Sequence, residues 1–458
     1  MRRYLPIVVY LIILSLVLTS AGLIVGAWAF RHVNAGGTRL PGPFVNLVID
    51  IAEVPSIVWR AKVQLFGSQV HPLIIDENAR GETFTNLQRF PEPTDPGYLL
   101  LSGLDDKTMT ATVRLLNISS GEEVLRWEPD WKTISQLTQE SKYSPKGDLR
   151  ALHSVHPILM NDGSIIFNTG SVLVKQTRCL TKPSWVLNGV FHHSNELADD
   201  GTIWTPSVNL DLIKTYEHPF LRSRFRDDAL ANVSPDGTLL NRISFASILR
   251  ANNLEHLMFG FSGNKFQEDP IHLNQITPAL INGAFWKKGD LLISARHLST
   301  IFLYRPNTNK IIWYKTGPWM NQHSAKFVDD RRISVFDNNV FALGFMNKAA
   351  TNRVFLFDFS SNELSEPFAT PLQSARVRTI TAGRAQIVSN NRLFVEETNY
   401  GRHLMISENS ILWLRRNEIG HNKDLGAVGW SRYIEADAGK QIEELAKVPC
   451  EKVQIHRK

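Results

Sequence analysis

The chain contains few cysteines and no strongly basic segment, and each shortage argues against a class of protein. Only Cys179 and Cys450 occur among the 458 residues, and no CxxC pair exists, so a thiolate zinc site is not expected. The two thiols can form one long-range disulfide in an extracytoplasmic domain, or both can stay free. The net charge is only +6, and no block of Lys and Arg with interleaved aromatic residues is present. The sequence therefore does not predict nucleic-acid binding.

Long helical patterns and low-complexity tracts are also missing. Hydrophobic residues make up 43% of the chain and charged residues 21%, a composition typical of a globular protein with a sizeable core. From about residue 96 onward, short apolar runs alternate with turn signals, and 11 Trp and 22 Pro accompany them. This pattern predicts an all-β protein and disfavours α/β folds.

One long apolar run is present, at residues 5–30, directly after Arg2 and Arg3. Its roughly 25 residues suffice to cross ~30 Å of hydrocarbon at a rise of ~1.5 Å per residue. A cleavable signal peptide has a shorter apolar core, although residues 27–29 resemble a cleavage site and leave removal open. Because a basic N-terminus stays in the cytoplasm, we expect residues 1–30 to be a transmembrane signal anchor of a bacterial inner membrane. The body of the protein would then lie in the periplasm.

Residues 31–95 differ from the rest of the chain and are predicted to be a juxtamembrane connector. Six prolines punctuate this segment, and Phe44, Leu47, Val48 and Ile51 have helical spacing. A short amphipathic helix here would lie on the membrane or dock on the globular part. Residues 96–458 are then expected to form the globular β domain.

Two sequence units recur within residues 96–458. The first is apolar–turn–apolar, often with an Asp-Gly turn that favours a hairpin; its copies lie at residues 156–170, 194–207, 230–244, 285–297, 325–338 and 385–398. The second is a hairpin that ends in an aromatic residue, at residues 111–127, 299–314, 353–368 and 402–414. One copy of each makes a four-stranded sheet, so six first units predict a six-bladed β-propeller, with seven blades as the alternative. A pair of β-sandwiches is the competing fold.

Several histidines stand at the entry of candidate innermost strands, where a propeller has its central channel. They are His156, His192, His193, His272 and His323. A single histidine at a strand end is usually only a polar residue with satisfied hydrogen bonds, but repeated placement predicts that several imidazoles converge. Arg296 adds a cation to this set. A guanidinium disfavours a bound divalent metal and suits an oxyanion such as sulfate or phosphate, so we expect no metal and no cofactor.

The motifs around these residues resemble the arylsulfotransferase family. In order they are DPIHLNQI, LLISARHLSTIFLY, KIIWYKTG, QHSAKFVDD and ISVFDNN, within residues 269–339. The family pattern runs D-x-x-H-x-N, S-x-R-H, I-x-W-x-x-G, Q-H and F-D-N-G, and the upstream HHSNELADDG is similar to its His-His segment. The last Gly of the pattern is Asn339 here, and Asn also tolerates positive φ. The resemblance implies a six-bladed propeller.

The resemblance also implies an activity and a role for each site residue. The family moves a sulfuryl group from an aryl sulfate to a phenol without a nucleotide donor. His323 matches the nucleophile that becomes sulfated, and His272 and Arg296 match the groups that act on the sulfuryl oxygens. Asn274 and His193 match substrate-binding residues, with His192 as the alternative to His193. We also expect Trp286, Trp319 or Phe191 to hold the phenol ring.

Two other functions are compatible with the same residues. A binding or scaffold propeller would keep the fold and part of the anion site without turnover. Hydrolysis, with water as the acceptor, would use the same nucleophile. The joint presence of His323, His272 and Arg296 favours the membrane-tethered transferase, since a non-catalytic relative has no need of a nucleophile.

Overall fold

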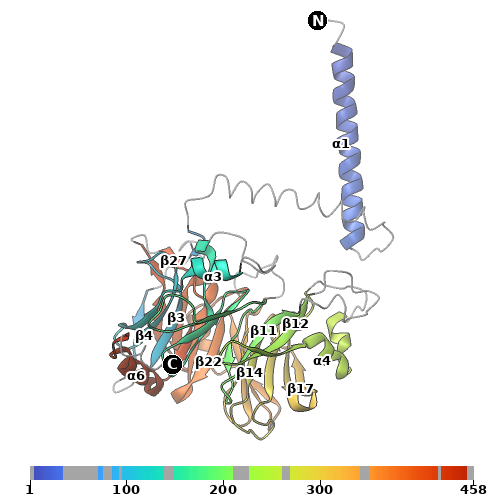
Figure 1. Cartoon of the computed structure of the whole chain (residues 1–458). Coiled ribbons are helices and arrows are strands. Elements are labelled where there is room, and N and C mark those ends of the chain that lie inside the picture. Colours follow the sequence, from blue (N-terminus) through green and yellow to red (C-terminus); the bar gives the residue numbers. More distant parts are fainter. Residues whose placement is uncertain are drawn as a thin grey trace. The chain divides into compact units, whose positions relative to one another are not determined.

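The chain consists of two compact units, and each is described by itself. In the computed structural model, the described residues are 5–34, 71–75, 85–91, 95–138, 149–209, 226–259, 269–340, 350–420 and 424–450. The first unit contains helix α1 (Leu5–Asn34), and the second, here called the body, contains every described strand (Figure 1).

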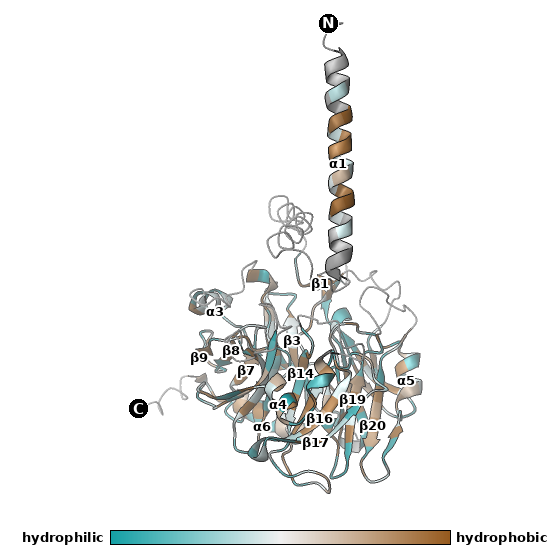
Figure 2. Ribbon diagram, turned by 90° about the vertical axis from the view of Figure 1, so that its right-hand side faces the viewer, coloured by the Kyte–Doolittle hydropathy of each residue, from teal (hydrophilic) through white to brown (hydrophobic). Residues whose placement is uncertain are grey.

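Helix α1 is 30 residues long and carries mostly apolar side chains (Figure 2). Exposed large apolar side chains occur along its described part, among them Tyr10, Leu16, Leu18, Leu23 and Ile24. Within the described residues, no helix combines the length and the apolar character that a membrane crossing requires. The anchor over residues 1–30 stays a prediction.

Parts of the predicted connector, residues 31–95, belong to the sheets of the body. β1 (Ile74–Ile75) pairs with β27 (Asp424–Gly426), and β2 (Leu87–Gln88) pairs with β25 (Ile411–Arg416). The proposed helix around Phe44 to Ile51 lies outside the described residues.

The all-β prediction is confirmed for the body. Its described residues form six antiparallel sheets of four or five strands and a small three-stranded sheet of β1, β27 and β26 (Glu418–Ile419). Three of the six are, in strand order, β28 (Arg432–Ile434), β3 (Tyr98–Leu104), β4 (Ala111–Asn117), β5 (Glu123–Trp127); β6 (Val155–Leu159), β7 (Ile165–Asn168), β8 (Leu173–Gln176), β9 (Trp185–Leu187); and β10 (Glu196–Leu197), β11 (Ile203–Asn209), β12 (Asp227–Val233), β13 (Leu239–Ser244).

The other three large sheets follow along the chain. They are β14 (Leu273–Pro278), β15 (Leu291–Ala295), β16 (Thr300–Arg305), β17 (Lys310–Thr316); β18 (Ala325–Phe327), β19 (Arg332–Asp337), β20 (Arg353–Asp358), β21 (Glu363–Ser365); and β22 (Arg384–Val388), β23 (Arg392–Glu397), β24 (Arg402–Ile406), with β25 and β2. The helices of the body are α3 (Trp131–Thr138), α4 (Phe245–Ala251), α5 (Ala369–Ser374), α6 (Ala436–Ala446) and the short 3-10 helices η2 (Leu149–Ala151), η4 (Glu255–Phe259), η5 (Pro306–Thr308), η6 (Ser389–Asn391) and η7 (Thr398–Tyr400).

Each large sheet shares apolar cores with two other large sheets. The six shared cores are represented by Leu230 with Ile276, Leu292 with Val335, Phe336 with Leu393, Phe394 with Leu101, Leu100 with Phe167, and Ile158 with Ile203. The first strands of the sheets are also bonded to one another, as where Thr277 Oγ1 donates to the carbonyl of Ala325 at 2.9 Å. The entries of these strands therefore lie near each other.

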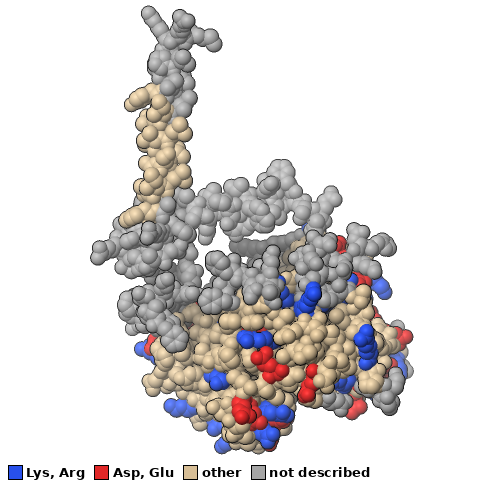
Figure 3. All heavy atoms as spheres, turned by 180° about the vertical axis from the view of Figure 1, so that it is seen from behind, with Lys and Arg blue, Asp and Glu red and all other residues tan. Residues whose placement is uncertain are grey.

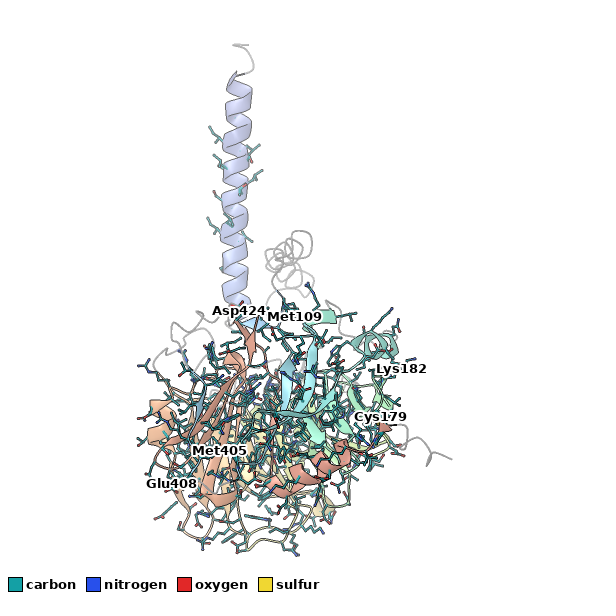
Figure 4. The ribbon with its side chains drawn as sticks, turned by 90° about the vertical axis from the view of Figure 1, so that its left-hand side faces the viewer. Met109, Cys179, Lys182, Met405, Glu408 and Asp424 are labelled. Carbon is teal, nitrogen blue, oxygen red and sulfur yellow. A yellow bond between two sulfur atoms is a disulfide. The ribbon has the colours of Figure 1, made fainter. Side chains whose placement is uncertain are left out.

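Cys179 and Cys450 form a disulfide between residues 271 positions apart (Figure 4). Their Cα atoms are 5.5 Å apart, a usual separation for this bond. Of the two arrangements that the sequence left open, the structure has the paired one. The bond holds the segment after α6 to the loop after β8.

Charged side chains of both signs are interspersed on the body (Figure 3). On the face in that view, Lys and Arg lie beside Asp and Glu rather than in one block. This distribution agrees with the modest net charge of +6.

Replacing both cysteines by alanine should lower the stability of the body without changing its fold. The disulfide closes a very long loop of the unfolded chain, and such bonds typically contribute about 2–4 kcal/mol. Thermal unfolding of the double variant, compared with the parent under non-reducing conditions, measures the loss. An unchanged melting temperature would show that the bond adds nothing to stability.

Candidate active site

Three strand-entry histidines have a backbone conformation that is rare for residues other than glycine. The φ angles are +47° at His156, +59° at His193 and +53° at His272, and Trp430 has +60°. Residues held in this region cost energy and concentrate at functional sites. The same unusual backbone conformation thus recurs where three different sheets begin.

Three of the predicted residues, His193, His272 and His323, meet in one group, here called the histidine cluster. Trp430 lies beside this cluster. The ring of His193 lies 5.2 Å from that of His272 and 6.1 Å from that of His323, between centroids. Trp430 lies 5.4 Å from His193 and 5.9 Å from His323. Arg296 is close enough for its charge to act on His323.

The tautomer of His323 follows from its neighbour Asn338. The amide nitrogen of Asn338 donates to the carbonyls of Thr379 at 2.9 Å and Ala382 at 2.7 Å. These two bonds turn the amide oxygen toward His323 Nδ1, at 2.5 Å. Because that oxygen only accepts, Nδ1 carries the proton. Nε2 is then the unprotonated nitrogen, and it is buried with no partner among the described residues.

Burial keeps His323 neutral over a wide pH range. The side chain is fully buried, and this burial, followed by the charge of Arg296, lowers its pKa to about 3. A neutral imidazole with a free Nε2 lone pair is the nucleophilic form of histidine.

A second chain of hydrogen bonds determines the tautomer of His193. Arg226 has only donors, and its guanidinium lies 3.1 Å from His192 Nε2, which must therefore accept. His192 Nδ1 then carries a proton and donates it to His193 Nδ1 at 2.7 Å. This leaves His193 Nε2 as a neutral N–H donor. Burial, followed by the charge of His192, holds the pKa of His193 well below its usual value.

His272 is paired with a carboxylate. Its Nδ1 donates to Asp269 Oδ2 at 2.5 Å, so the pair resembles the acid–base dyads of hydrolases. Burial raises the pKa of Asp269, but the hydrogen bond from His272 together with the charges of His272 and Arg226 outweighs this effect, and the pKa is lowered.

Arg296 is held by its sequence neighbour. Its Nη1 donates to His297 Nε2 at 2.8 Å, and His297 Nδ1 donates to the carbonyl of Asp269 at 2.6 Å. The Nε of Arg296 is buried without a partner among the described residues. Burial lowers the pKa of Arg296, with the charge of Asp269 opposing the shift.

Among the described residues, Asp269, His272 and His297 form the one group with metal-ligand spacing, with ligand atoms within 4.8 Å of one another. Two of these atoms already bond to each other, and His297 Nε2 accepts from Arg296. A guanidinium bonded to a ligand nitrogen opposes a bound cation, so hydrogen bonding accounts for the group.

Asn274 and the proposed ring-binding residues are held by contacts within the body. The amide nitrogen of Asn274 donates to the carbonyl of Gln322 at 3.1 Å, so one of its donors positions the backbone before His323. The prediction that Trp286, Trp319 or Phe191 holds the phenol ring was wrong, because all three belong to the apolar cores between strands. Trp430, which belongs to none of the motifs, is the aromatic residue beside the histidine cluster.

Sequence reasoning also missed the residues that orient the histidines. Asp269, His297 and Asn338 stand inside the quoted motifs, so their positions were visible although their partners were not. Arg226 lies far from any motif, and only the folded chain brings it to His192.

A known protein family matches the part of the chain that contains these motifs. The model of the family described as arylsulfotransferase (ASST) matches residues 158–418, more than half of the chain. No curated protein matches the chain.

Solved structures are similar only at a distance. A protein of unknown function from Bacteroides caccae is 12% identical, with a TM-score of 0.45, covering 73% of this chain and 98% of that one. A streptogramin B lyase is 12% identical, with a TM-score of 0.38 and coverage of 76% and 98%. The Pan2 WD40 domain of Neurospora crassa is 8% identical, with a TM-score of 0.39 and coverage of 76% and 89%. With TM-scores below 0.5, these similarities indicate no function for the chain.

Replacing His323 by asparagine should weaken the dependence of stability on acid. In the folded protein the pKa of His323 is about 3, whereas in the unfolded chain it is near 6.5. The unfolded state therefore binds more protons between these values, so the contribution is full above pH 6.5 and is lost as the pH falls toward 3. Between pH 7 and 4 it amounts to about 3 kcal/mol.

Denaturant unfolding at several pH values measures this difference. His323→Asn should lose less stability than the parent on acidification, and His256→Asn, at an exposed position of η4, should follow the parent. Equal slopes for parent and His323→Asn would contradict the burial of a neutral imidazole.

Proposed function

The chain belongs to the arylsulfotransferase family, and from this premise we propose that it transfers a sulfuryl group from an aryl sulfate to a phenol. We propose His323 as the nucleophile, which carries the group between the two substrates as a sulfohistidine. The observation that carries this proposal is the buried Nε2 of His323, which has no hydrogen-bond partner among the described residues, while Nδ1 is bonded to Asn338.

In the first step, Nε2 of His323 attacks the sulfur of the aryl sulfate. The new N–S bond forms as the bond from sulfur to the aryl oxygen breaks, and that oxygen takes the electron pair. His272, supported by Asp269, gives the leaving phenolate a proton.

In the second step, a phenol enters and the roles reverse. His272 takes the proton of the phenol hydroxyl, the phenol oxygen attacks sulfur, and the N–S bond breaks. The electron pair returns to Nε2, and the proton lost in the first step is recovered. Two steps through one nucleophile allow donor and acceptor to use the same site in turn.

Two further groups stabilise negative charge on the sulfuryl oxygens. Arg296 offers its planar guanidinium, and His193 offers the N–H at Nε2. Donors that are already oriented before the reaction lower the transition-state energy more than mobile ones. Trp430 lies beside His193 and His323 and would contact the aromatic ring of the substrate.

We also propose that the six large sheets are the blades of a six-bladed propeller. Each shares a core with two others, and this cyclic order is what a propeller requires. The strand-entry histidines would then line its central channel, in agreement with their mutual distances.

The proposed location is the periplasm, with residues 1–30 as an inner-membrane anchor. The disulfide between Cys179 and Cys450 supports an oxidising compartment. Arg2 and Arg3 before the apolar run support a cytoplasmic N-terminus, and the exposed apolar side chains of α1 would be covered by lipid.

His323→Asn should abolish sulfuryl transfer, because no neighbouring base can replace an attacking nitrogen. Incubation of the parent with p-nitrophenyl sulfate, without acceptor, should add one sulfuryl group to His323, detected by mass spectrometry of the peptide. Addition of a phenol should discharge the label and yield its sulfate. Transfer by His323→Asn at near the parent rate would refute the proposed role.

Product analysis in the same reaction separates transfer from hydrolysis. Release of inorganic sulfate without an aryl sulfate product would identify water as the acceptor. A parent protein that neither becomes labelled nor releases p-nitrophenol would be a binding propeller.

Of two reporters fused after residue 450, we expect no activity from one that requires the cytoplasm and activity from one that folds only in the periplasm. Alkaline phosphatase is such a reporter because its own disulfides form there, and a cytoplasmic reporter at the same position is the matched control. The reverse result would place the body in the cytoplasm.

A further inference from the structure

A second set of polar residues, four of them buried and two half-buried, lies on the innermost strands, apart from the groups assigned to the reaction. Each of the six first strands contributes one member to this set, here called the inner ring: His156 on β6, Glu196 on β10, Gln275 on β14, Lys326 on β18, Arg384 on β22 and Arg432 on β28. Four of them are hydrogen-bonded through Glu196, and Arg432 also donates to a fifth, at His156 Nδ1 and 3.4 Å.

Glu196 is the centre of these bonds. Its carboxylate accepts from Gln275 at 3.0 Å, from Lys326 and from Arg432 at 3.1 Å. Arg432 also donates to the carbonyls of Pro157 and Asn195. The basic side chains of Lys326 and Arg432 are therefore neutralised or hydrogen-bonded within the ring.

Arg384 is the exception. Its side chain is 1% exposed, and all three guanidinium nitrogens are buried without a hydrogen-bond partner among the described residues. A buried cation without a partner is costly. Of the fully buried arginines of the body, Arg402 has the usual arrangement, with its guanidinium paired to Glu397.

The facing carboxylate in the sheet cannot serve Arg384. Glu396 is its cross-strand partner on β23, but the oxygens of Glu396 already accept from the backbone of Trp430 and Ser431 and from the side chains of Thr398 and His403. These donors occupy both oxygens.

Within the described part of the chain, His156 supplies a second donor without a partner. Its Nδ1 accepts from the backbone N–H of Asn195 at 2.9 Å, so the proton is on Nε2. That Nε2 is buried and lies 3.8 Å from the carboxylate of Glu196, beyond hydrogen-bond distance. Burial, followed by the charge of Arg384, holds the pKa of His156 well below its usual value.

The charges of this region do not cancel. Lys326, Arg384 and Arg432 are three basic groups, whereas Glu196 and Glu396 are two carboxylates. Burial lowers the pKa of Lys326 to about 7 and that of Arg384 to about 10. The charge of Arg432 adds to both shifts, and the carboxylate of Glu196 opposes them.

We propose that Arg384 and His156 bind a small monovalent inorganic anion inside the ring of innermost strands. One negative charge balances the excess of one basic group, and a halide accepts from guanidinium and imidazole N–H groups without itself needing a donor. Trp430, 5.9 Å from His156 and 5.9 Å from His323, separates this site from the histidine cluster. The inference does not depend on the reaction proposed above.

Chloride titration of the purified full-length protein tests the site. Sodium gluconate is replaced stepwise by sodium chloride at constant ionic strength, and thermal unfolding is recorded. Because an anion bound only to the folded state stabilises it, the melting temperature should rise by about 2 °C for each tenfold increase in chloride. In Arg384→Gln this rise should disappear.

Arg402→Gln is the matched control, since it also removes a buried guanidinium but one that is already paired. It should melt at a lower temperature and keep the full dependence on chloride. If Arg384→Gln does not fold, Arg384→Lys, which keeps the charge but loses the planar fork, should show a reduced dependence. The proposal would be overturned if the melting temperature of the parent protein did not respond to chloride. It would also be overturned if Arg384→Gln or Arg384→Lys kept the full dependence of the melting temperature on chloride.

Crystals of the parent protein grown in bromide give an independent reading. An anomalous peak at hydrogen-bond distance from Arg384 is expected. Density for water alone at that position, without an anomalous signal, would overturn the assignment.

Discussion

The pairing of β28 with β3 is the interaction on which the arrangement of the body depends. Arg432, Tyr433 and Ile434 pair with Leu100, Leu99 and Tyr98, so a strand from the end of the body is the first strand of a sheet from its beginning. This pairing places Trp430 beside the histidine cluster and Arg432 beside Glu196. Without it, neither group of buried polar residues is complete.

Close backbone contact makes this junction possible. Gly429 donates its N–H to the carbonyl of Ser102 and accepts from the N–H of His156, and a Cβ atom at this position would lie 2.2 Å from the carbonyl oxygen of Ser154. Only glycine fits there. One residue thus connects the sheets of β3 and β6 and aligns the strand that carries Trp430.

Burial and hydrogen bonding act together on the histidines. Burial keeps His323 and His193 neutral, and each neutral ring has two tautomers. Asn338 selects one for His323, and Arg226, through His192, selects one for His193. The result is one nitrogen that can attack and another that can donate, from two side chains of the same chemical type.

Local signals in the sequence predicted many of the hairpins. The units at residues 156–170, 194–207, 325–338 and 385–398 contain the β6–β7, β10–β11, β18–β19 and β22–β23 hairpins, because a turn and its flanking apolar residues are close in sequence. The unit at 230–244 has the same local pattern but forms the outer hairpin β12–β13. Nothing local distinguishes an inner hairpin from an outer one.

The candidate site was predictable where a motif recorded it and not elsewhere. His193, His272, His323 and Arg296 stood in recognisable motifs. Trp430 did not, because its place depends on the β28–β3 pairing, which joins residues more than 300 positions apart. The membrane anchor and the catalytic roles stay predictions, since they concern an environment and a reaction rather than a packing arrangement.

The late position of β28 has a consequence for biosynthesis. A ribosome produces His193, His272 and His323 well before Trp430 and Arg432, so a growing chain has these imidazoles while its last inner strand is still missing. Until that strand emerges, water reaches the imidazoles of His193 and His323, and burial does not yet act on them. The arrangement of the histidine cluster is therefore completed only when synthesis of the body is nearly finished.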